Sequence, residues 1–145
     1  MGKFLILIAM LMSTLSHAGD NEYGIYLSGF SKHVGIEDNT MNEQNYGVGF
    51  WYNNLEVIMV KNSYSKLGFG AYYHPKFKFE YVDLGLRLGG TTGYSETPVN
   101  MVITPIAHAT ATIKLDRLRV ETGILPNIED HKLKPILTLM FGYSF

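Results

Sequence analysis

The chain closes on Pro135 to Phe145 (PILTLMFGYSF), a stretch in which two kinds of side chain alternate. Such a period of two predicts a β-strand. One face would be strongly apolar and aromatic, and a soluble edge strand with such a face would invite aggregation. The apolar face carries Leu137, Leu139, Phe141, Tyr143 and Phe145, and the smaller, more polar face carries Ile136, Thr138, Met140, Gly142 and Ser144.

A second stretch, Tyr81 to Gly89, shows the same alternation with charges added. Val82, Leu84, Leu86 and Leu88 fall on one face, opposite Asp83, Gly85, Arg87 and Gly89. Aliphatic residues facing lipid and polar residues facing a lumen are typical of a membrane β-barrel. A soluble sandwich with its charges outside has the same periodicity, so this stretch alone leaves both folds open.

The N-terminal segment, residues 1–18, is predicted to be a signal peptide. Lys3 gives a positive start, Phe4 to Met12 (FLILIAMLM) is an apolar run, and Ser16 to Ala18 supplies small residues around a cleavage site. The alternative is a transmembrane anchor, but the run is well short of the roughly 20 residues that span a bilayer. Residues 19–145 are therefore expected to be exported. No later run approaches helix-spanning length, so any membrane insertion would use strands.

An exported chain that ends on an alternating aromatic strand with a final phenylalanine, here Phe145, resembles bacterial outer-membrane barrel proteins. The resemblance implies that the barrel assembly machinery recognises this ending. We predict one domain, an all-β, eight-stranded antiparallel transmembrane β-barrel over 19–145, acting as a monomer. A soluble lipocalin-like barrel is the alternative. The expected strands are 23–32, 45–53, 55–62, 66–75, 79–91, 99–112, 114–125 and 134–145.

The connections alternate in length, as they do between the periplasmic and extracellular ends of such barrels. Asn53-Asn54 and the turn at Asp116 are tight, whereas 33–44, 92–98 and 126–133 are longer and are expected outside the cell, together with 62–66. Eight strands leave room only for side chains or one small ligand.

Composition excludes several classes of function. With 12 Lys and Arg against 13 Asp and Glu, the 145-residue chain lacks the basic footprint of a nucleic-acid-binding protein. It has no cysteine, which excludes a disulfide scaffold, a thiolate zinc site and a cysteine nucleophile. His74, His108 and His131 lack metal-ligand spacing, so we expect no metal and no other cofactor. Paired charges are expected to fill the lumen instead of a hydrophobic core, namely Glu43, Asp83, Arg87, Arg119 and Glu121.

Several short stretches, in order along about 30–145, resemble the outer-membrane lipid A palmitoyltransferases (PagP) and related small barrels, some of them phage-borne. They are Lys32-His33-Val34, Asn42-Glu43, Gly47-Val48-Gly49-Phe50, Lys61 to Lys66 (KNSYSK), Gly68-Phe69-Gly70, Val102-Ile103-Thr104-Pro105 and Leu125-Pro126. The resemblance implies transfer of a palmitoyl chain from a phospholipid to lipid A, so both outer-membrane lipids would be partners.

The resemblance also implies catalytic residues in the outer loops. His33 falls on the family histidine, expected as the base, and Ser63 falls on the family serine, expected as hydroxyl partner or oxyanion donor. The family aspartate is Asn62 here. Asparagine can orient an imidazole but cannot stabilise its charge, and in serine proteases that change costs about 10⁴ in rate. A loop-capping role for Ser63 is the alternative.

Four further residues are implied to bind substrate. Pro105 and Pro126 would flank a lateral opening, because proline cannot donate to the strand ladder; each is alternatively a proline at a strand end. Gly68 and Gly70 would make room for an acyl chain, or would simply ease strand curvature.

Two functions therefore stay open. One is an acyltransferase acting on lipid A. The other is a non-catalytic surface barrel, for instance a phage-encoded one that alters its host's surface. Asn62 favours the second, whereas His33, Ser63, Pro105 and Pro126 favour the first.

Overall fold

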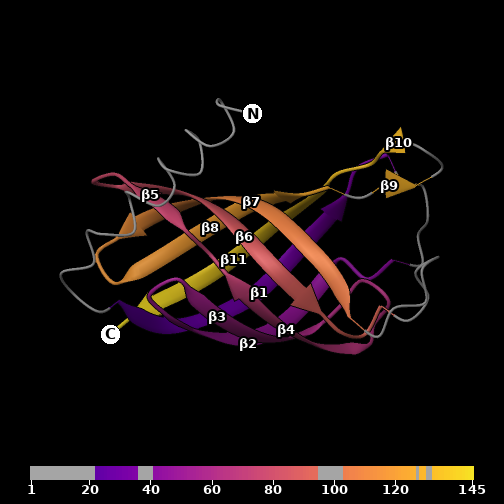
Figure 1. Ribbon diagram of the computed structural model, residues 1–145, viewed down its shortest axis with the longest axis horizontal. Coiled ribbons are helices and arrows are strands. Elements are labelled where there is room, and N and C mark those ends of the chain that lie inside the picture. The colour runs from indigo at the N-terminus through magenta and orange to yellow at the C-terminus, as the bar shows by residue number, and fades with distance from the viewer. Residues whose placement is uncertain (1–21, 36–40, 95–102, 127, 130–131) are drawn as a thin grey trace, which may run out of the picture.

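A computed structural model describes residues 22–35, 41–94, 103–126, 128–129 and 132–145 of the chain. The fold is a closed antiparallel β-barrel with its long axis horizontal in Figure 1. The strands are β1 (Tyr23–His33), β2 (Gln44–Tyr52), β3 (Leu55–Lys61), β4 (Leu67–Tyr73), β5 (Lys76–Lys78), β6 (Val82–Thr91), β7 (Thr104–Leu115), β8 (Leu118–Leu125), β9 (Ile128–Glu129), β10 (Lys132–Leu133) and β11 (Ile136–Ser144).

Each barrel strand pairs with its neighbours in sequence, and β1 pairs with β11 to close the ring. The short connections and the C-terminus lie at one end, the turn end, at the left of Figure 1. The tight turns there place Asn53 and Asp116 at φ of 53° and 56°, which asparagine and aspartate tolerate better than most residues. The longer connections, between β1 and β2, β3 and β4, β6 and β7, and β8 and β11, lie at the opposite end, the loop end. Here β9 and β10 form a separate hairpin. The predicted eight-stranded barrel is confirmed.

The fourth barrel strand differs from the prediction. It continues past residue 75 as β5, and β4 and β5 both pair with β6. Proline has no N–H for the ladder, so the strand is interrupted at His74 and Pro75. The Leu86 N–H donates to the Pro75 carbonyl at 3.1 Å and bridges the interruption. The turn therefore falls at 79–81, inside the predicted strand 79–91.

The turn between β7 and β8 also corrects the predicted bounds. β7 runs to Leu115 and β8 starts at Leu118, where the prediction ended one strand at 112 and began the next at 114. The predicted signal peptide and residues 99–102 of the predicted sixth strand lie outside the described residues. Among the described residues, no helix is long and apolar enough to cross a membrane.

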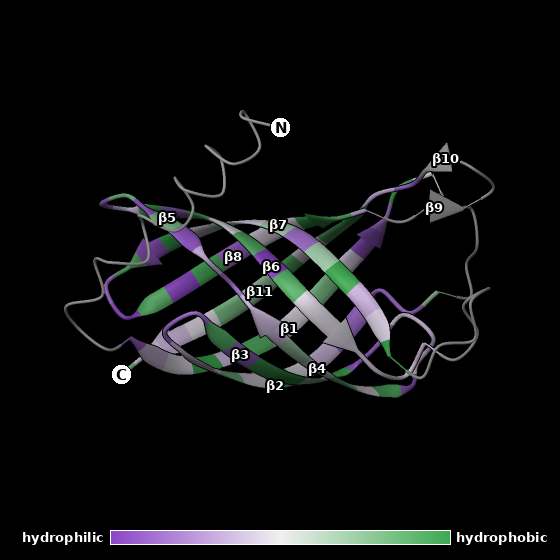
Figure 2. Cartoon of the chain, in the orientation of Figure 1, coloured by the Kyte–Doolittle hydropathy of each residue, from purple (hydrophilic) through white to green (hydrophobic). Residues whose placement is uncertain are grey.

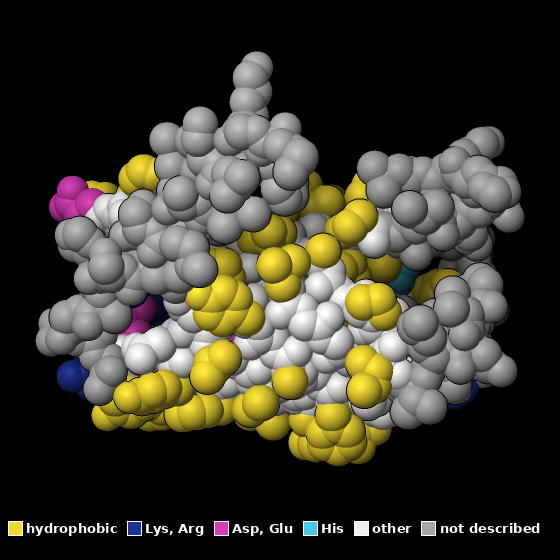
Figure 3. All heavy atoms as spheres, viewed as in Figure 1, with side chains coloured by type: hydrophobic (Ala, Val, Ile, Leu, Met, Phe, Trp, Pro, Cys, Tyr) yellow, Lys and Arg dark blue, Asp and Glu magenta, His cyan; other side chains and the backbone are white. Residues whose placement is uncertain are grey.

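The barrel is apolar outside and polar inside. Bands of hydrophobic and hydrophilic residues alternate along the strands in Figure 2. Hydrophobic side chains are spread over the visible outer wall in Figure 3. On β6, the leucines at 84, 86 and 88 are exposed, while Asp83 and Arg87 are buried, as predicted. A sheet with this polarity is stable with lipid around it. The exposed aliphatic and aromatic side chains include Leu27, Val48, Phe50, Val57, Met59, Leu84, Leu86, Leu88, Ile113, Ile124, Leu137 and Phe141.

Exposed aromatic side chains gather near both ends of the wall. The turn end carries Tyr23, Tyr52, Phe79, Tyr81, Tyr143 and Phe145, and the loop end carries Phe30, Tyr46 and Phe69. Aromatic girdles of this kind mark the two interfaces of a bilayer. At the turn end, the terminal Phe145 stacks on Tyr23 with ring centroids 5.8 Å apart, so the last residue of the chain is held beside the first strand.

Candidate functional site

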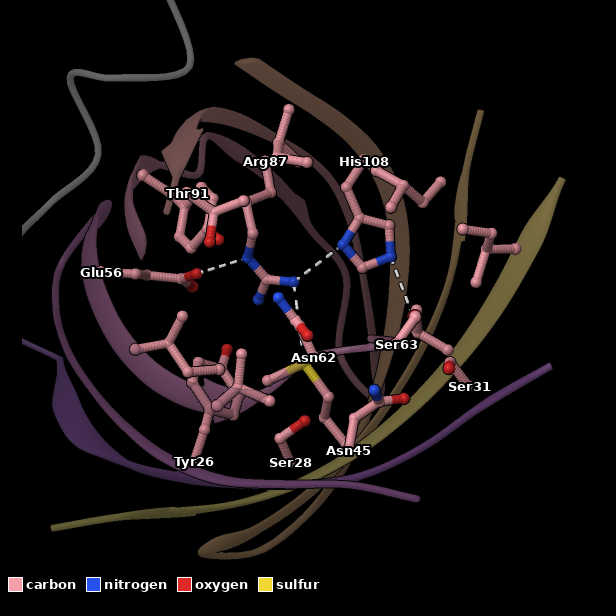
Figure 4. A pocket seen from close by; sticks show the side chains of 18 of the residues that line it. Tyr26, Ser28, Ser31, Asn45, Glu56, Asn62, Ser63, Arg87, Thr91 and His108 are labelled. Atoms are coloured by element: carbon pink, nitrogen blue, oxygen red, sulfur yellow. Dashed lines mark hydrogen bonds and ion pairs between the residues drawn. The ribbon is translucent and has the colours of Figure 1, made fainter. Parts of the chain in front are cut away.

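The middle of the lumen is crossed by an ion-pair cluster centred on Arg87 (Figure 4). Arg87 Nε donates to Glu56 Oε2 at 2.6 Å, and Nη2 donates to Glu121 Oε1 at 2.8 Å. All three side chains are buried. They come from β6, β3 and β8, so the cluster ties together opposite sides of the barrel wall. Two carboxylates around one guanidinium are further balanced by Lys76, whose Nζ lies 3.7 Å from Glu56.

Two buried histidines complete this cluster. Because arginine only donates, His108 Nδ1 accepts from Arg87 Nη1 at 3.0 Å, and His108 Nε2 donates to Thr138 at 2.9 Å. His74 Nδ1 donates to Glu56 Oε1 at 2.6 Å, and its Nε2 accepts from Thr110 at 2.7 Å. Both rings have both nitrogens occupied. In the part of the chain that the structure describes, no group of three or more His, Cys, Asp or Glu side chains could hold a metal ion.

A second set of charges fills the lumen toward the turn end. Asp83 Oδ1 forms an ion pair with Lys114 Nζ at 2.7 Å, and Asp83 Oδ2 accepts from Arg119 Nη1 at 3.5 Å. Arg119 also lies over the Trp51 ring, 5.9 Å from its centroid. Trp51 in turn packs against Tyr26 at 4.3 Å between ring centroids. The lumen is thus filled by paired charges and a few large side chains, as eight-stranded barrels require.

The predicted lumen charges are confirmed for Asp83, Arg87, Arg119 and Glu121, but Glu43 is a correction. Glu43 precedes β2 at the loop end and pairs with the exposed Lys32 at 2.9 Å. The Lys32 hydrogen bond lowers the pKa of the Glu43 carboxyl. Glu56 was not predicted as a lumen charge. Strand alternation indicates it nonetheless, because its neighbours Leu55 and Val57 both face outward.

Four of the residues predicted from the resemblance meet at the loop end. His33, Ser63, Pro105 and Pro126 all line one pocket of about 150 Å³, which we call the rim pocket, and Tyr94 lines it too. Ser63 is hydrogen-bonded with Tyr94, and burial raises the pKa of the Tyr94 phenol to about 12. The phenol is therefore neutral at ordinary pH. His33 is buried, and its Nδ1 has no hydrogen-bond partner among the described residues.

Asn62, the third predicted catalytic residue, holds the loop between β3 and β4. Its Oδ1 accepts from the N–H groups of Tyr64 and Lys66, each at 3.0 Å. Its Nδ2 donates to the Gly93 carbonyl at 2.8 Å, which links this loop to the chain after β6. Both the oxygen and the nitrogen of the Asn62 amide are thus hydrogen-bonded to backbone groups. Asn62 is not among the residues that line the rim pocket.

Replacing Asn62 by aspartate is expected to lower the free energy of unfolding by about 1–2 kcal/mol, because a carboxylate oxygen would face the Gly93 carbonyl where an amide now donates. Asn62→Ala is expected to cost more, since it also leaves the Tyr64 and Lys66 N–H groups without their acceptor. Urea unfolding in detergent micelles measures both variants. An Asn62→Asp barrel as stable as the wild type would contradict this role.

The other predicted binding residues are placed as follows. The ladder between β7 and β8 ends at the pair Ala109 and Ile124, so Pro105 and Pro126 both lie beyond the last paired residues. Their role as a lateral opening stays a prediction. Gly68 and Gly70 face the lumen, but the Tyr72 hydroxyl occupies the space over Gly70 and neither glycine lines the rim pocket. An acyl-chain role for these glycines stays untested.

Of the comparisons with known proteins, the one with solved structures bears on the architecture. No family model matches the chain, and no curated protein matches it. The crystal structure of Ail, the attachment invasion locus protein of Yersinia pestis, in complex with the heparin analogue sucrose octasulfate, matches with a TM-score of 0.50 and 16% identity, over 87% of this chain and 99% of that one. The backbone structure of the Y. pestis outer membrane protein Ail in a phospholipid bilayer nanodisc gives 0.44 and 14%, over 87% and 100%.

These findings correct the resemblance to lipid A palmitoyltransferases, which is wrong: the solved structure of Ail matches the chain, and no family model supports the other assignment. The stretches that suggested it are short, and they combine glycines facing the lumen with aromatic residues facing lipid. Any small membrane barrel needs both, so such stretches carry little family information. The chain has the fold of a bacterial outer-membrane β-barrel with eight strands.

Proposed function

We propose that the protein is a non-catalytic surface barrel of the outer membrane, which acts through the loops at its loop end. The observation that carries this proposal is the paired cluster around Arg87. It joins three strands across the lumen and leaves its charged groups engaged with one another. Charged groups that are engaged in this way favour neither conduction nor charge-driven chemistry. The loop end is then the part that meets molecules outside the cell.

The arrangement of the loop-end residues supports the same proposal. Activation of a hydroxyl needs a base within hydrogen-bond reach and a group that orients the base. Asn62, the expected orienter, is committed to backbone groups, and Ser63 is hydrogen-bonded with Tyr94. Ail, a barrel of the same fold, is named the attachment invasion locus protein of Yersinia pestis. Contact with partners outside the cell is the class of role that we propose here.

Mass spectrometry of lipid A tests the non-catalytic proposal. Lipid A from bacteria that make the wild-type protein is expected to match lipid A from bacteria that make His33→Ala, with no added acyl chain in either. Both strains must hold equal amounts of folded barrel in the outer membrane. An acyl chain added by the wild type and lost with His33→Ala would overturn the proposal and establish an acyltransferase.

A further inference from the structure

Between the Arg87 cluster and the loop end, the lumen holds a cavity of about 120 Å³. Glu56, Arg87 and His108 lie at its inner side (Figure 4). The cavity adjoins the rim pocket, because Ser63 and Tyr94 line both, so it is reached from the loop end. Much of its wall is apolar and comes from β3, β7, β8 and β11: Ile58, Val60, Ile106, Leu125, Ile136 and Met140.

Two polar atoms in this wall have no partner among the residues that the structure describes: Asn45 Oδ1 and Ser31 Oγ. Only 9% of Asn45 is exposed, and its Nδ2 donates to the carbonyls of Lys61 at 3.1 Å and Asn42 at 3.5 Å. Those two bonds fix the orientation of the amide and leave Oδ1 as an acceptor at the cavity. Burying a polar atom without a partner costs free energy, so a site that supplies a partner is favoured.

The same feature recurs in the adjoining rim pocket. His33 Nδ1 and Thr104 Oγ1 are buried there, again without a partner in the described chain. One further buried side-chain polar atom of the described residues lacks a hydrogen bond, namely Asp83 Oδ1 at the turn end, and it forms an ion pair with Lys114 Nζ at 2.7 Å instead. The unpaired polar atoms are thus concentrated where the lumen is hollow.

The charges at the inner side of the cavity give an ion little to bind. Arg87 already donates to Glu56, Glu121 and His108, and Lys76 adds a second positive charge beside Glu56. The occupant is therefore expected to be uncharged. Its size follows from the volume, since an apolar cavity of about 150 Å³ in another protein holds benzene.

We propose that this cavity binds a small uncharged molecule with an apolar body about the size of a benzene ring and a hydroxyl group. The body lies against the aliphatic walls. The hydroxyl donates to Asn45 Oδ1 and accepts from Ser31 Oγ, so that both atoms gain the partner they lack. A long acyl chain is too large for this volume.

Phenol is the probe, and toluene is its matched control, because toluene has the ring without the hydroxyl. We expect phenol to shift the Asn45 side-chain amide resonances of the ¹⁵N-labelled, refolded barrel in a saturable way, and to bind more tightly than toluene. Ser31→Ala removes a hydroxyl that forms no hydrogen bond with the described residues. It is expected to weaken phenol binding about three- to tenfold and to leave toluene binding unchanged.

Val60→Phe, which fills the cavity, is expected to abolish the saturable shifts in the same micelles and so to separate binding from partition into detergent. The proposal is overturned if phenol gives no saturable shift, as a cavity occupied by water alone would behave. It is equally overturned if phenol and toluene bind with the same affinity, or if folded Ser31→Ala and Val60→Phe barrels bind phenol as the wild type does.

Discussion

Replacing Arg87 with alanine is expected to lower the free energy of unfolding of the barrel by about 3–5 kcal/mol, the scale on which buried ion pairs respond to loss of one partner. Arg87 is 4% exposed and donates to two buried carboxylates, Glu56 and Glu121. Without it, their repulsion and desolvation are compensated only by Lys76 and by neutral hydrogen bonds. We therefore expect this to be the most damaging single change in the lumen.

The matched control also removes the two carboxylate charges that Arg87→Ala leaves without their arginine partner. Arg87→Ala combined with Glu56→Gln and Glu121→Gln is expected to recover most of the lost stability, because neutral amides are far cheaper to bury than unpaired carboxylates. Urea unfolding in lipid vesicles can be followed by fluorescence of Trp51, the single tryptophan of the chain, which is buried. An Arg87→Ala barrel within about 1 kcal/mol of the wild type would show that the cluster contributes little.

The second large effect is expected on the outer face. Leu86→Arg places a charge between the exposed Leu84 and Leu88, near the middle of β6, and should destabilise the barrel by about 2–4 kcal/mol in lipid vesicles. The cost arises because the guanidinium must enter the hydrocarbon region. Neighbouring lipid cannot supply the hydrogen bonds that water gives it.

Leu115→Arg is the control for that change. Leu115 is also exposed and apolar, but it lies beside the turn at Asp116, where the charge can reach the interface and should cost about 0–1 kcal/mol. Both variants are measured by the same urea unfolding. Equal costs for the two variants would mean that β6 does not run through the depth of the bilayer.

The strand alternation of 82–89 and 135–145 predicted the barrel only together with the expected export and the terminal Phe145. On β6 it also predicted which side chains face outward (Leu84, Leu86 and Leu88) and which face the lumen (Asp83 and Arg87). It could not predict the pairing of Arg87 with Glu56 and Glu121, which lie 31 and 34 positions away. Those contacts depend on the stagger of strands around the ring, and a single sequence carries no direct signal of stagger. The interruption at Pro75 escaped prediction for a related reason. A proline indicates a missing donor but does not say that Leu86 will bridge the gap.

For the candidate site, the location of several residues was predicted, whereas their roles stay predictions. The sequence brought His33, Ser63, Pro105 and Pro126 to the same end, and the structure places all four in one pocket. It assigned Asn62 the wrong set of contacts, because the resemblance supplied a catalytic position where the loop needed an asparagine for three backbone hydrogen bonds. The cavity beneath could not be anticipated. Its unpaired atoms on Ser31 and Asn45 become visible only once neighbouring side chains are in place.

Single-cysteine labelling tests whether the chain crosses the outer membrane with its loop end at the cell surface. The chain has no cysteine, so Ser65→Cys at the loop end and Arg117→Cys at the turn end each give one exposed thiol. A maleimide-polyethylene glycol too large to enter the periplasm is applied to intact bacteria. We predict labelling of Ser65→Cys on intact cells, and of Arg117→Cys only after the outer membrane is permeabilised. Labelling of Arg117→Cys on intact cells, or protection of Ser65→Cys, would contradict the account.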